Sequence, residues 1–333
     1  MDSIWINILG FLICAIAIVF SGIRLAKYGD EIAELTGWGK AWVGLILMAS
    51  VTSLPELMTG LSAVVFVDAP NLAAGDVLGS CMFNLLILSF IDFRIKKPIT
   101  SLVKNSHLLA GLFGIILVSI VGYAILTSAS TAEILWISPF SMVITIVYIF
   151  TIWTIFKFDH NTVSIESKSD IEAIEKKAKL KRAVLIYAAN AALVIVAGLF
   201  LPYFGEHVAK STGVNNTFFG TLFLAAATSL PELVVSFAAI RIGAFDMVVG
   251  NLLGSNIFNI FILALDDVFY TKGSLFANLH KENLESVIMI IIMTAIVGIG
   301  IMTKSTAKIW KLGIDSFVIL LLYIFLIIAL YYK

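Results

Sequence analysis

Long apolar stretches, separated by short polar connections, dominate the chain from end to end. About 20 consecutive apolar residues in a helix are enough to cross the hydrocarbon core of a bilayer. The pattern therefore predicts an all-α polytopic membrane protein with ten transmembrane helices. The predicted spans cover residues 4–25, 39–66, 72–91, 106–127, 133–156, 182–203, 215–240, 246–265, 284–303 and 308–331.

The composition agrees with this class, because 60% of the residues are hydrophobic and only 13% are charged. Asp2 precedes the first apolar run and no small-residue cleavage site follows it, which indicates a first span rather than a signal peptide. Cys14 and Cys81 lie in apolar segments, so a disulfide framework is not expected. With zero net charge and no basic patch, the chain is expected to bind no nucleic acid, and no obligate protein partner is evident.

Most of the 22 Lys and Arg residues fall in connections on one side of the predicted membrane. Only four fall on the other side: Lys210, Lys272, Lys281 and Lys333. Cytoplasmic connections carry an excess of Lys and Arg in membrane proteins. The asymmetry therefore predicts a protein of the cell membrane with both termini outside.

Three sequence blocks recur at an offset of 175 or 176 residues, and five predicted spans lie in each half. The paired blocks are residues 29–37 with 205–213, 48–56 with 224–232, and 75–84 with 250–259. Because five is odd, the second half enters the membrane in the opposite sense, as in the inverted repeats of secondary transporters. We therefore predict a first inverted repeat at 1–157, a cytoplasmic linker with a short amphipathic helix at 158–181, and a second repeat at 182–333.

The second block contains Thr-Ser-Leu-Pro-Glu in both halves, in the middle of a predicted span. A carboxylate at that depth, such as Glu56 or Glu232, costs at least ~2.5–3.5 kcal/mol on insertion scales. Pro55 has no N–H, so it predicts a helix break that leaves nearby carbonyls, such as those of Ala49 and Thr52, free to face a ligand. No Lys or Arg lies mid-span to pair with the glutamates. The pattern predicts a site built from two discontinuous helices at the centre of the protein.

The available ligands are carboxylate, hydroxyl and carbonyl oxygens, which suit hard cations such as Ca²⁺ and Na⁺. The third block adds Ser80 with Asn84 and Ser255 with Asn259, each pair spaced i, i+4 on one helix face. These four side chains and Asp76 are predicted to line the site. Asp76, one turn before Ser80, has two equal interpretations, as a cation attractor at the outer mouth or as a helix cap.

At these residues the sequence resembles the calcium/cation antiporter superfamily, specifically the prokaryotic sodium/calcium exchanger type. The resemblance rests on two copies of Thr-Ser-Leu-Pro-Glu, each followed by Gly-Ser-x-x-x-Asn, and covers nearly the whole chain. It implies exchange of Ca²⁺ for Na⁺ by alternating access, with the first and sixth spans sliding together across the rest. It implies no enzymatic activity and no cofactor, only the two transported ions and the lipid bilayer.

The resemblance also implies the ligands of each ion. The implied Ca²⁺ site consists of Glu56, Glu232 and the carbonyls of Thr52 and Thr228. The implied Na⁺ sites share these residues and add Ser53, Ser80, Ser229, Ser255 and the carbonyls of Ala49 and Ala225.

Some positions depart from the family pattern. Asn259 stands where prokaryotic relatives often carry Asp, and Asp76 and Cys81 stand where the family usually has Asn. Ser50-Val51 precedes Thr52 where small residues are usual. The central site is therefore expected to hold two carboxylates, a charge that one Ca²⁺ or two Na⁺ would neutralise. If the family's exchange of three Na⁺ holds, one net charge crosses per cycle.

Three other functions remain open from the residues alone. A proton-coupled exchanger of Ca²⁺ or another divalent cation would protonate the glutamates in place of binding Na⁺. A cation channel could carry acidic residues in its filter, although filters usually lie on an axis along the pore. An intramembrane hydrolase could use a carboxylate dyad, although hydroxyls beside each glutamate fit ion coordination better.

Overall fold

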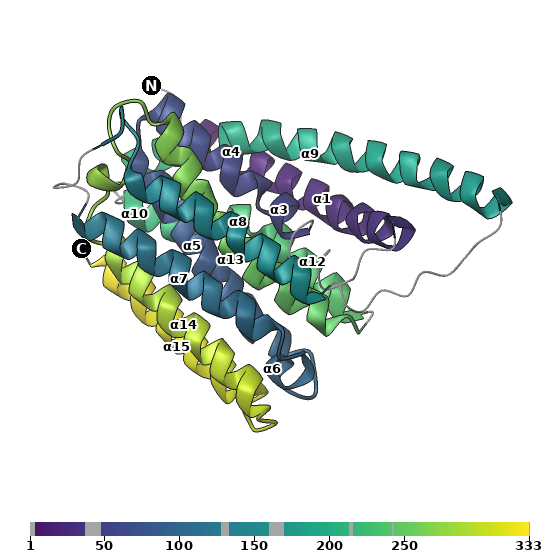
Figure 1. The fold of residues 1–333 in the computed structure, drawn as a ribbon. Helices are drawn as coiled ribbons and strands as arrows, with labels where there is room; N and C mark the ends of the chain where they lie inside the picture. Colours follow the sequence, from purple (N-terminus) through teal and green to yellow (C-terminus); the bar gives the residue numbers. More distant parts are fainter. Residues whose placement is uncertain are drawn as a thin grey trace.

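A computed structural model describes residues 4–36, 48–127, 133–159, 170–212, 216–241 and 243–332. The described chain is almost entirely helical (Figure 1). Its one small sheet is a hairpin of β1 (Lys308–Ile309) and β2 (Leu312–Gly313). The predicted all-α membrane fold is therefore confirmed.

The described helices of the first half include three short pieces where the second span was predicted. In order they are α1 (Ile4–Thr36), α3 (Ala49–Thr52), α4 (Leu54–Ser62), the π-helix η2 (Ala63–Val67), α5 (Pro70–Asp92), α6 (Ile99–Leu102), α7 (His107–Thr127) and α8 (Pro139–Asp159).

The second half repeats this order with a similar interruption. Its helices are α9 (Asp170–Thr212), α10 (Asn216–Phe219), the π-helix η5 (Gly220–Leu224), α11 (Ala225–Thr228), α12 (Leu230–Arg241), α13 (Phe245–Phe269), the 3₁₀-helix η6 (Phe276–Asn278), α14 (Asn283–Thr303) and α15 (Ile314–Tyr331).

All ten predicted spans correspond to helical segments of the described chain. Eight segments are long and apolar enough to cross a membrane, and a ninth forms if the bent pair Thr217–Thr228 and Leu230–Arg241 counts as one span. The tenth is α8, whose apolar part, Pro139–Ile155, is shorter. The first residues of the predicted second span, 39–47, lie outside the described residues.

Three predicted boundaries were wrong for local reasons. The last span begins at Ile314 rather than 308, because Trp310 and Lys311 adopt positive φ and turn the chain into the hairpin. The fifth begins at Pro139, a residue favoured at the first helical position. The sixth begins at Asp170, so residues 170–181 form its first turns rather than a separate short helix. No Gly or Pro interrupts that stretch, and its Ala, Leu, Glu and Lys residues favour helix.

Two helices, α5 and α13, form the enclosed centre of the bundle, with most of their length buried. In contrast, α1 and α9 lie side by side at one edge, and α14 and α15 lie at the opposite edge (Figure 1). The helix α1 begins, and α15 ends, at the same end of the bundle (Figure 1). This arrangement fits an even number of crossings.

A pair of buried aspartates makes equivalent contacts in the two halves. Asp92 ends α5 and Asp267 lies near the end of α13, at the repeat offset of 175 residues. Each accepts one N–H from the segment after its own helix and one from the segment before the last helix of the other half, at 2.6–2.9 Å: Asp92 from Ile99 and Gly313, and Asp267 from Leu275 and Ser138. The matched contacts support an approximate two-fold relation between the halves.

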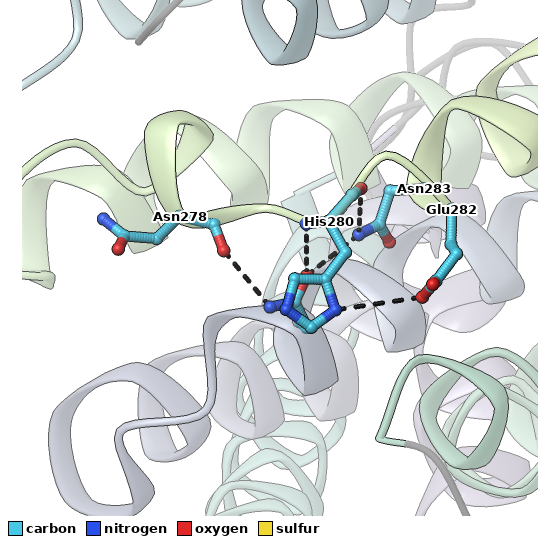
Figure 2. A network of polar contacts seen from close by, with 5 residues as sticks. Asn278, His280, Glu282 and Asn283 are labelled. Atoms are coloured by element: carbon cyan, nitrogen blue, oxygen red, sulfur yellow. Dashed lines mark hydrogen bonds and ion pairs between the residues drawn. The ribbon is translucent and has the colours of Figure 1, made fainter.

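The connection between α13 and α14 is fastened to the start of α5. The Asn71 side chain donates to the Asn278 carbonyl at 3.2 Å and accepts from the His280 N–H at 2.7 Å and the Asn283 amide at 3.1 Å. His280 Nδ1 also lies 3.8 Å from Glu282 Oε2, and Figure 2 shows this network from close by. The network fixes one end of the bundle around the start of α5.

A second link at the same end joins Asp68 to Lys272. The Lys272 ammonium donates to Asp68 Oδ2 at 2.7 Å. This hydrogen bond lowers the pKa of the Asp68 carboxyl below its usual value and raises the pKa of Lys272 above its own. Both groups are exposed, so the pair contributes little to stability.

Candidate cation-binding site

Both predicted helix breaks are present, and each falls on the serine of the Thr-Ser-Leu-Pro-Glu block. Ser53 separates α3 from α4, and Ser229 separates α11 from α12, which are bent by 42° from one another. Each proline lies at the second position of its half-helix, where no helical N–H partner is needed. The glutamates follow in the first turns of α4 and α12, where the helix dipole favours negative charge.

One expectation about the backbone at these breaks was wrong. The Ala49 carbonyl is not free, because it accepts the N–H of Ser53 at 3.0 Å, and the Ala225 carbonyl likewise accepts the N–H of Ser229. The proline removes only the N–H that would reach Val51 in the first half, and the serine N–H still completes its own turn. The helical bonds resume where Leu57 N–H meets the Ser53 carbonyl. The hydroxyls of Thr52 and Thr228 also donate to these two oxygens at 3.3 Å, so any ion ligation by Ala49 or Ala225 would have to displace a hydrogen bond.

Each glutamate accepts a hydrogen bond from the serine of the opposite repeat. Ser229 donates to Glu56 Oε1 at 3.1 Å, and Ser53 donates to Glu232 Oε1 at 3.4 Å. Glu232 Oε1 also accepts from Ser255 at 3.3 Å. Each carboxylate therefore takes a hydroxyl from the broken helix of the other repeat. All five side chains are fully buried.

The two threonines are matched in the same way with α5 and α13. Thr52 Oγ1 lies 3.3 Å from Ser255 Oγ, and Thr228 Oγ1 lies 3.3 Å from Ser80 Oγ. Thr52 also donates to Asn251 Oδ1 at 3.5 Å. The structure thus brings together hydroxyl groups from both broken helices and both central helices, as the sequence predicted.

Asp76 is neither at a mouth nor a helix cap, so both interpretations of it were wrong. It is fully buried in α5, two turns beyond the N-cap residue Ala69, and its Oδ1 accepts the Thr228 hydroxyl at 2.9 Å. Its carboxylate is close enough to Glu56 and Glu232 for the three negative charges to repel one another. Asp76 therefore adds a third buried carboxylate near the two predicted glutamates, because α5 carries it deep into the bundle beside the second repeat.

One oxygen of each of these carboxylates has no hydrogen-bond partner among the described residues: Glu56 Oε2, Glu232 Oε2 and Asp76 Oδ2. A buried, unpaired carboxylate oxygen is costly and suits a cation. Within the described part of the chain, no three His, Cys, Asp or Glu side chains converge closely enough to hold a metal ion by themselves. A bound cation would therefore need hydroxyl or carbonyl oxygens as well.

The two predicted asparagines are buried beside an asparagine that the prediction missed. Asn256 Oδ1 accepts from Asn84 Nδ2 at 3.1 Å, and Asn256 Nδ2 donates to the Cys81 carbonyl at 3.0 Å. Asn256 is the repeat counterpart of Cys81, a relation that the block alignment contained. Neither polar atom of the Asn259 side chain has a partner in the described structure.

A bundle of apolar helices with two matched breaks, lined by oxygen atoms at its buried centre, defines a secondary transporter for small hard cations. The chain belongs to the sodium/calcium exchanger protein family, whose model matches residues 6–157 and 182–332.

Individual relatives agree with this assignment. The chain is 26% identical to an uncharacterized membrane protein of Methanocaldococcus jannaschii over 85% of its own length and 86% of the relative's. It is 25% identical to inner membrane protein YrbG of Escherichia coli over 88% and 92% of the two chains. It is 46% identical to the sodium/calcium exchanger MaX1 of Methanosarcina acetivorans over 24% of its length and 23% of that protein.

A solved structure of the sodium-calcium exchanger NCX_Mj has the same fold. The two chains superpose with a TM-score of 0.67, and the match covers 98% of this chain and 99% of that one. At 23% identity this likeness concerns the fold.

Proposed function

We propose that this protein is an antiporter that exchanges Ca²⁺ for Na⁺ by alternating access, with one shared ion site at the centre of the bundle. The observation that carries the proposal is the reciprocal pair of buried glutamates, each hydrogen-bonded by the serine of the opposite repeat. Family membership supports the choice of Ca²⁺ and Na⁺ as the exchanged ions.

The proposed Ca²⁺ ligands are the carboxylates of Glu56 and Glu232 with the carbonyls of Thr52 and Thr228. The unpaired second oxygen of each glutamate supports this assignment. Ca²⁺ takes six to eight oxygen ligands, so further oxygens are required from hydroxyls or water. The proposed Na⁺ sites add the four serines and the carbonyls of the two alanines: Ser53, Ser80, Ser229, Ser255, Ala49 and Ala225.

Shared ligands would couple the two ions. Because both need Glu56 and Glu232, Ca²⁺ and Na⁺ would bind alternately rather than together. An empty site would leave unpaired carboxylates in a low-dielectric interior, which disfavours the crossing of an unloaded carrier. Competition at one site is then sufficient to link the two fluxes.

We further infer a cell-membrane location with both termini outside, and two inverted repeats at 1–157 and 182–333. The asymmetry of Lys and Arg among the connections supports the orientation. The matched contacts of Asp92 and Asp267 support the repeats.

The test is Ca²⁺ uptake into proteoliposomes loaded with Na⁺, compared with vesicles that carry only a pH gradient. Uptake driven by the Na⁺ gradient and abolished by Glu56→Gln and by Glu232→Gln is expected. Uptake that responds only to the pH gradient would contradict Na⁺ coupling. Uptake that persists in both variants would contradict the proposed site.

A further inference from the structure

Asp266, near the end of α13, is a buried carboxylate outside the central site. Its side chain is fully enclosed, and neither oxygen has a hydrogen-bond partner among the described residues. The neighbouring Asp267 is different, because its oxygens accept hydrogen bonds from Ser138, Ser141 and Leu275. The hydrogen bonds of Asp267 offset the cost of burying its charge. Asp266 has no such bonds, so an apolar residue at its position would cost less free energy to bury. Its repeat counterpart is the apolar Ile91.

The position of Asp266 on α13 connects it to the central site. At 100° per residue, Asp266 lies on the same helix face as Asn259 and Ser255, seven and eleven positions earlier. Asn259 also has no partner for either polar atom of its side chain. Two unpaired polar side chains therefore lie on this face of α13: Asn259 beside the site, and Asp266 two turns, or about 10 Å, further along the helix axis, with the buried Ile262 and Leu263 between them.

The half-helix α4, which carries Glu56, faces this side of α13. Gly60 follows Glu56 by four residues, one turn further along the same face. A Cβ atom at Gly60 would clash with Asp266 Oδ2 and lie 2.8 Å from Oδ1. The Asp266 carboxylate therefore rests on the bare Cα of Gly60, directly beside the face that leads to Glu56.

The electrostatics of this region favour cations. Asp266 lies within electrostatic reach of Asp76, which itself interacts with Glu56 and Glu232. No ion pair with Lys, Arg or His is found at Asp266 in the described chain. A carboxylate without a charged partner in a low-dielectric interior gains free energy from a cation bound beside it.

We propose that Asp266 is a relay station that binds the transported cation on its way between the central site and the solution at the 270–282 end of the bundle. This inference rests on the proposed function. The ligand class is a hard, oxygen-preferring cation, because the station offers carboxylate oxygens. Within the described residues no three acidic side chains, Cys or His converge there, so binding is transient rather than tight.

The test measures Ca²⁺ transport by Asp266→Asn in membrane vesicles of both orientations. The near-isosteric amide removes the charge and preserves the shape. We expect the KM for Ca²⁺ to rise about tenfold when Ca²⁺ is supplied at the 270–282 end, because the amide lacks the charge that attracts the cation. The KM at the opposite end should be unchanged.

A second variant and a control complete the design. Gly60→Ala keeps the charge but pushes the carboxylate off the α4 face, so it should raise the same KM. Asp315→Asn makes the same chemical change at the start of α15, where Asp315 accepts a hydrogen bond from Thr100, and should leave both KM values unchanged. An unchanged KM at the 270–282 end in folded Asp266→Asn or Gly60→Ala, or an equal rise at both ends, would overturn the relay. Absence of exchange in the unmodified protein would instead overturn the proposed function.

Discussion

At the scale of single residues, the central feature is reciprocity between the two Thr-Ser-Leu-Pro-Glu blocks. Glu56 accepts a hydrogen bond from Ser229, and Glu232 accepts hydrogen bonds from Ser53 and Ser255. The two halves of the chain thus build one site rather than two. A change in either block should therefore affect ion binding in a similar way.

The paired serines provide the first prediction. Ser53→Ala and Ser229→Ala each remove one proposed Na⁺ ligand, and a lost polar contact of this kind costs roughly 1 kcal/mol, or about fivefold in affinity. Both variants should raise the Na⁺ concentration needed for half-maximal exchange by a similar factor. Ser101→Ala, whose hydroxyl donates to the Pro98 carbonyl, serves as the control. A large effect from one serine and none from its counterpart would contradict the shared site.

Asp76 provides the second prediction. Coulomb energy scales with the product of the charges, so a nearby carboxylate stabilises a divalent ion more than a monovalent one. Asp76→Asn, which introduces the amide found at its counterpart Asn251, should weaken Ca²⁺ binding about tenfold, or ~1.4 kcal/mol, and Na⁺ binding less. Titration calorimetry of both ions on the purified variant measures this difference. Equal weakening of both ions would mean that Asp76 acts on the fold rather than on the ion.

At the scale of elements, the long helices α1 and α9 each rest on the broken helix of the opposite half. An added Cβ at Gly22 in α1 would lie 2.5 Å from the Pro231 Cβ atom of α12. An added Cβ at Gly198 in α9 would lie 2.9 Å from the Met58 Cβ atom of α4 and 3.3 Å from the Pro55 carbonyl. The two glycines are 176 residues apart, the repeat offset. These contacts place the predicted sliding pair directly on the prolines of the site.

The third prediction concerns these glycines. Gly22→Ala and Gly198→Ala should destabilise the protein by about 1–3 kcal/mol through overpacking. Gly114→Ala is the matched control, because an added Cβ there meets no atom within 4 Å, and it should gain helix propensity instead. Thermal unfolding in detergent compares the three variants. Equal midpoints for all three would contradict a close contact at the prolines.

The sequence predicted the elements well because its signals there were strong and doubled. Apolar length predicted the ten helices, and Pro55 with Pro231 predicted both breaks. The starts of α15 and α9 were predicted wrongly, because the prediction rested on the length of apolar runs. That length reveals neither the tight hairpin at Trp310 nor the continuation of the helix into the polar linker.

The site was only partly predictable for a related reason. The repeated residues could be identified without knowing their contacts, but Asp76, Asn256 and Asp266 differ between the halves. Their roles depend on which helices α5 and α13 face, and helix contacts between distant segments cannot be read from spacing along one helix.

At the scale of the whole molecule, the proposed cycle moves charge across the membrane. If three Na⁺ exchange for one Ca²⁺, one net charge crosses per cycle. A potential of 100 mV then contributes ~2.3 kcal/mol, which corresponds to a change of about 50-fold in the Ca²⁺ gradient at equilibrium.

The fourth prediction is therefore a potential-dependent Ca²⁺ gradient. In proteoliposomes with fixed Na⁺ concentrations, an inside-positive potential set by K⁺ and valinomycin should increase Ca²⁺ accumulation when Na⁺ leaves the vesicle. A gradient that does not respond to the potential would indicate two Na⁺ per Ca²⁺ and an electroneutral cycle.

The central claim is that Ca²⁺ and Na⁺ share one site between Glu56 and Glu232. The most direct measurement is Ca²⁺ binding to the purified protein by titration calorimetry at increasing Na⁺, with Glu56→Gln and Glu232→Gln alongside. One Ca²⁺ per chain is expected, with an apparent Kd that rises with Na⁺ and with no binding in either variant. Ca²⁺ binding that ignores Na⁺, or that survives in both variants, would contradict the shared site.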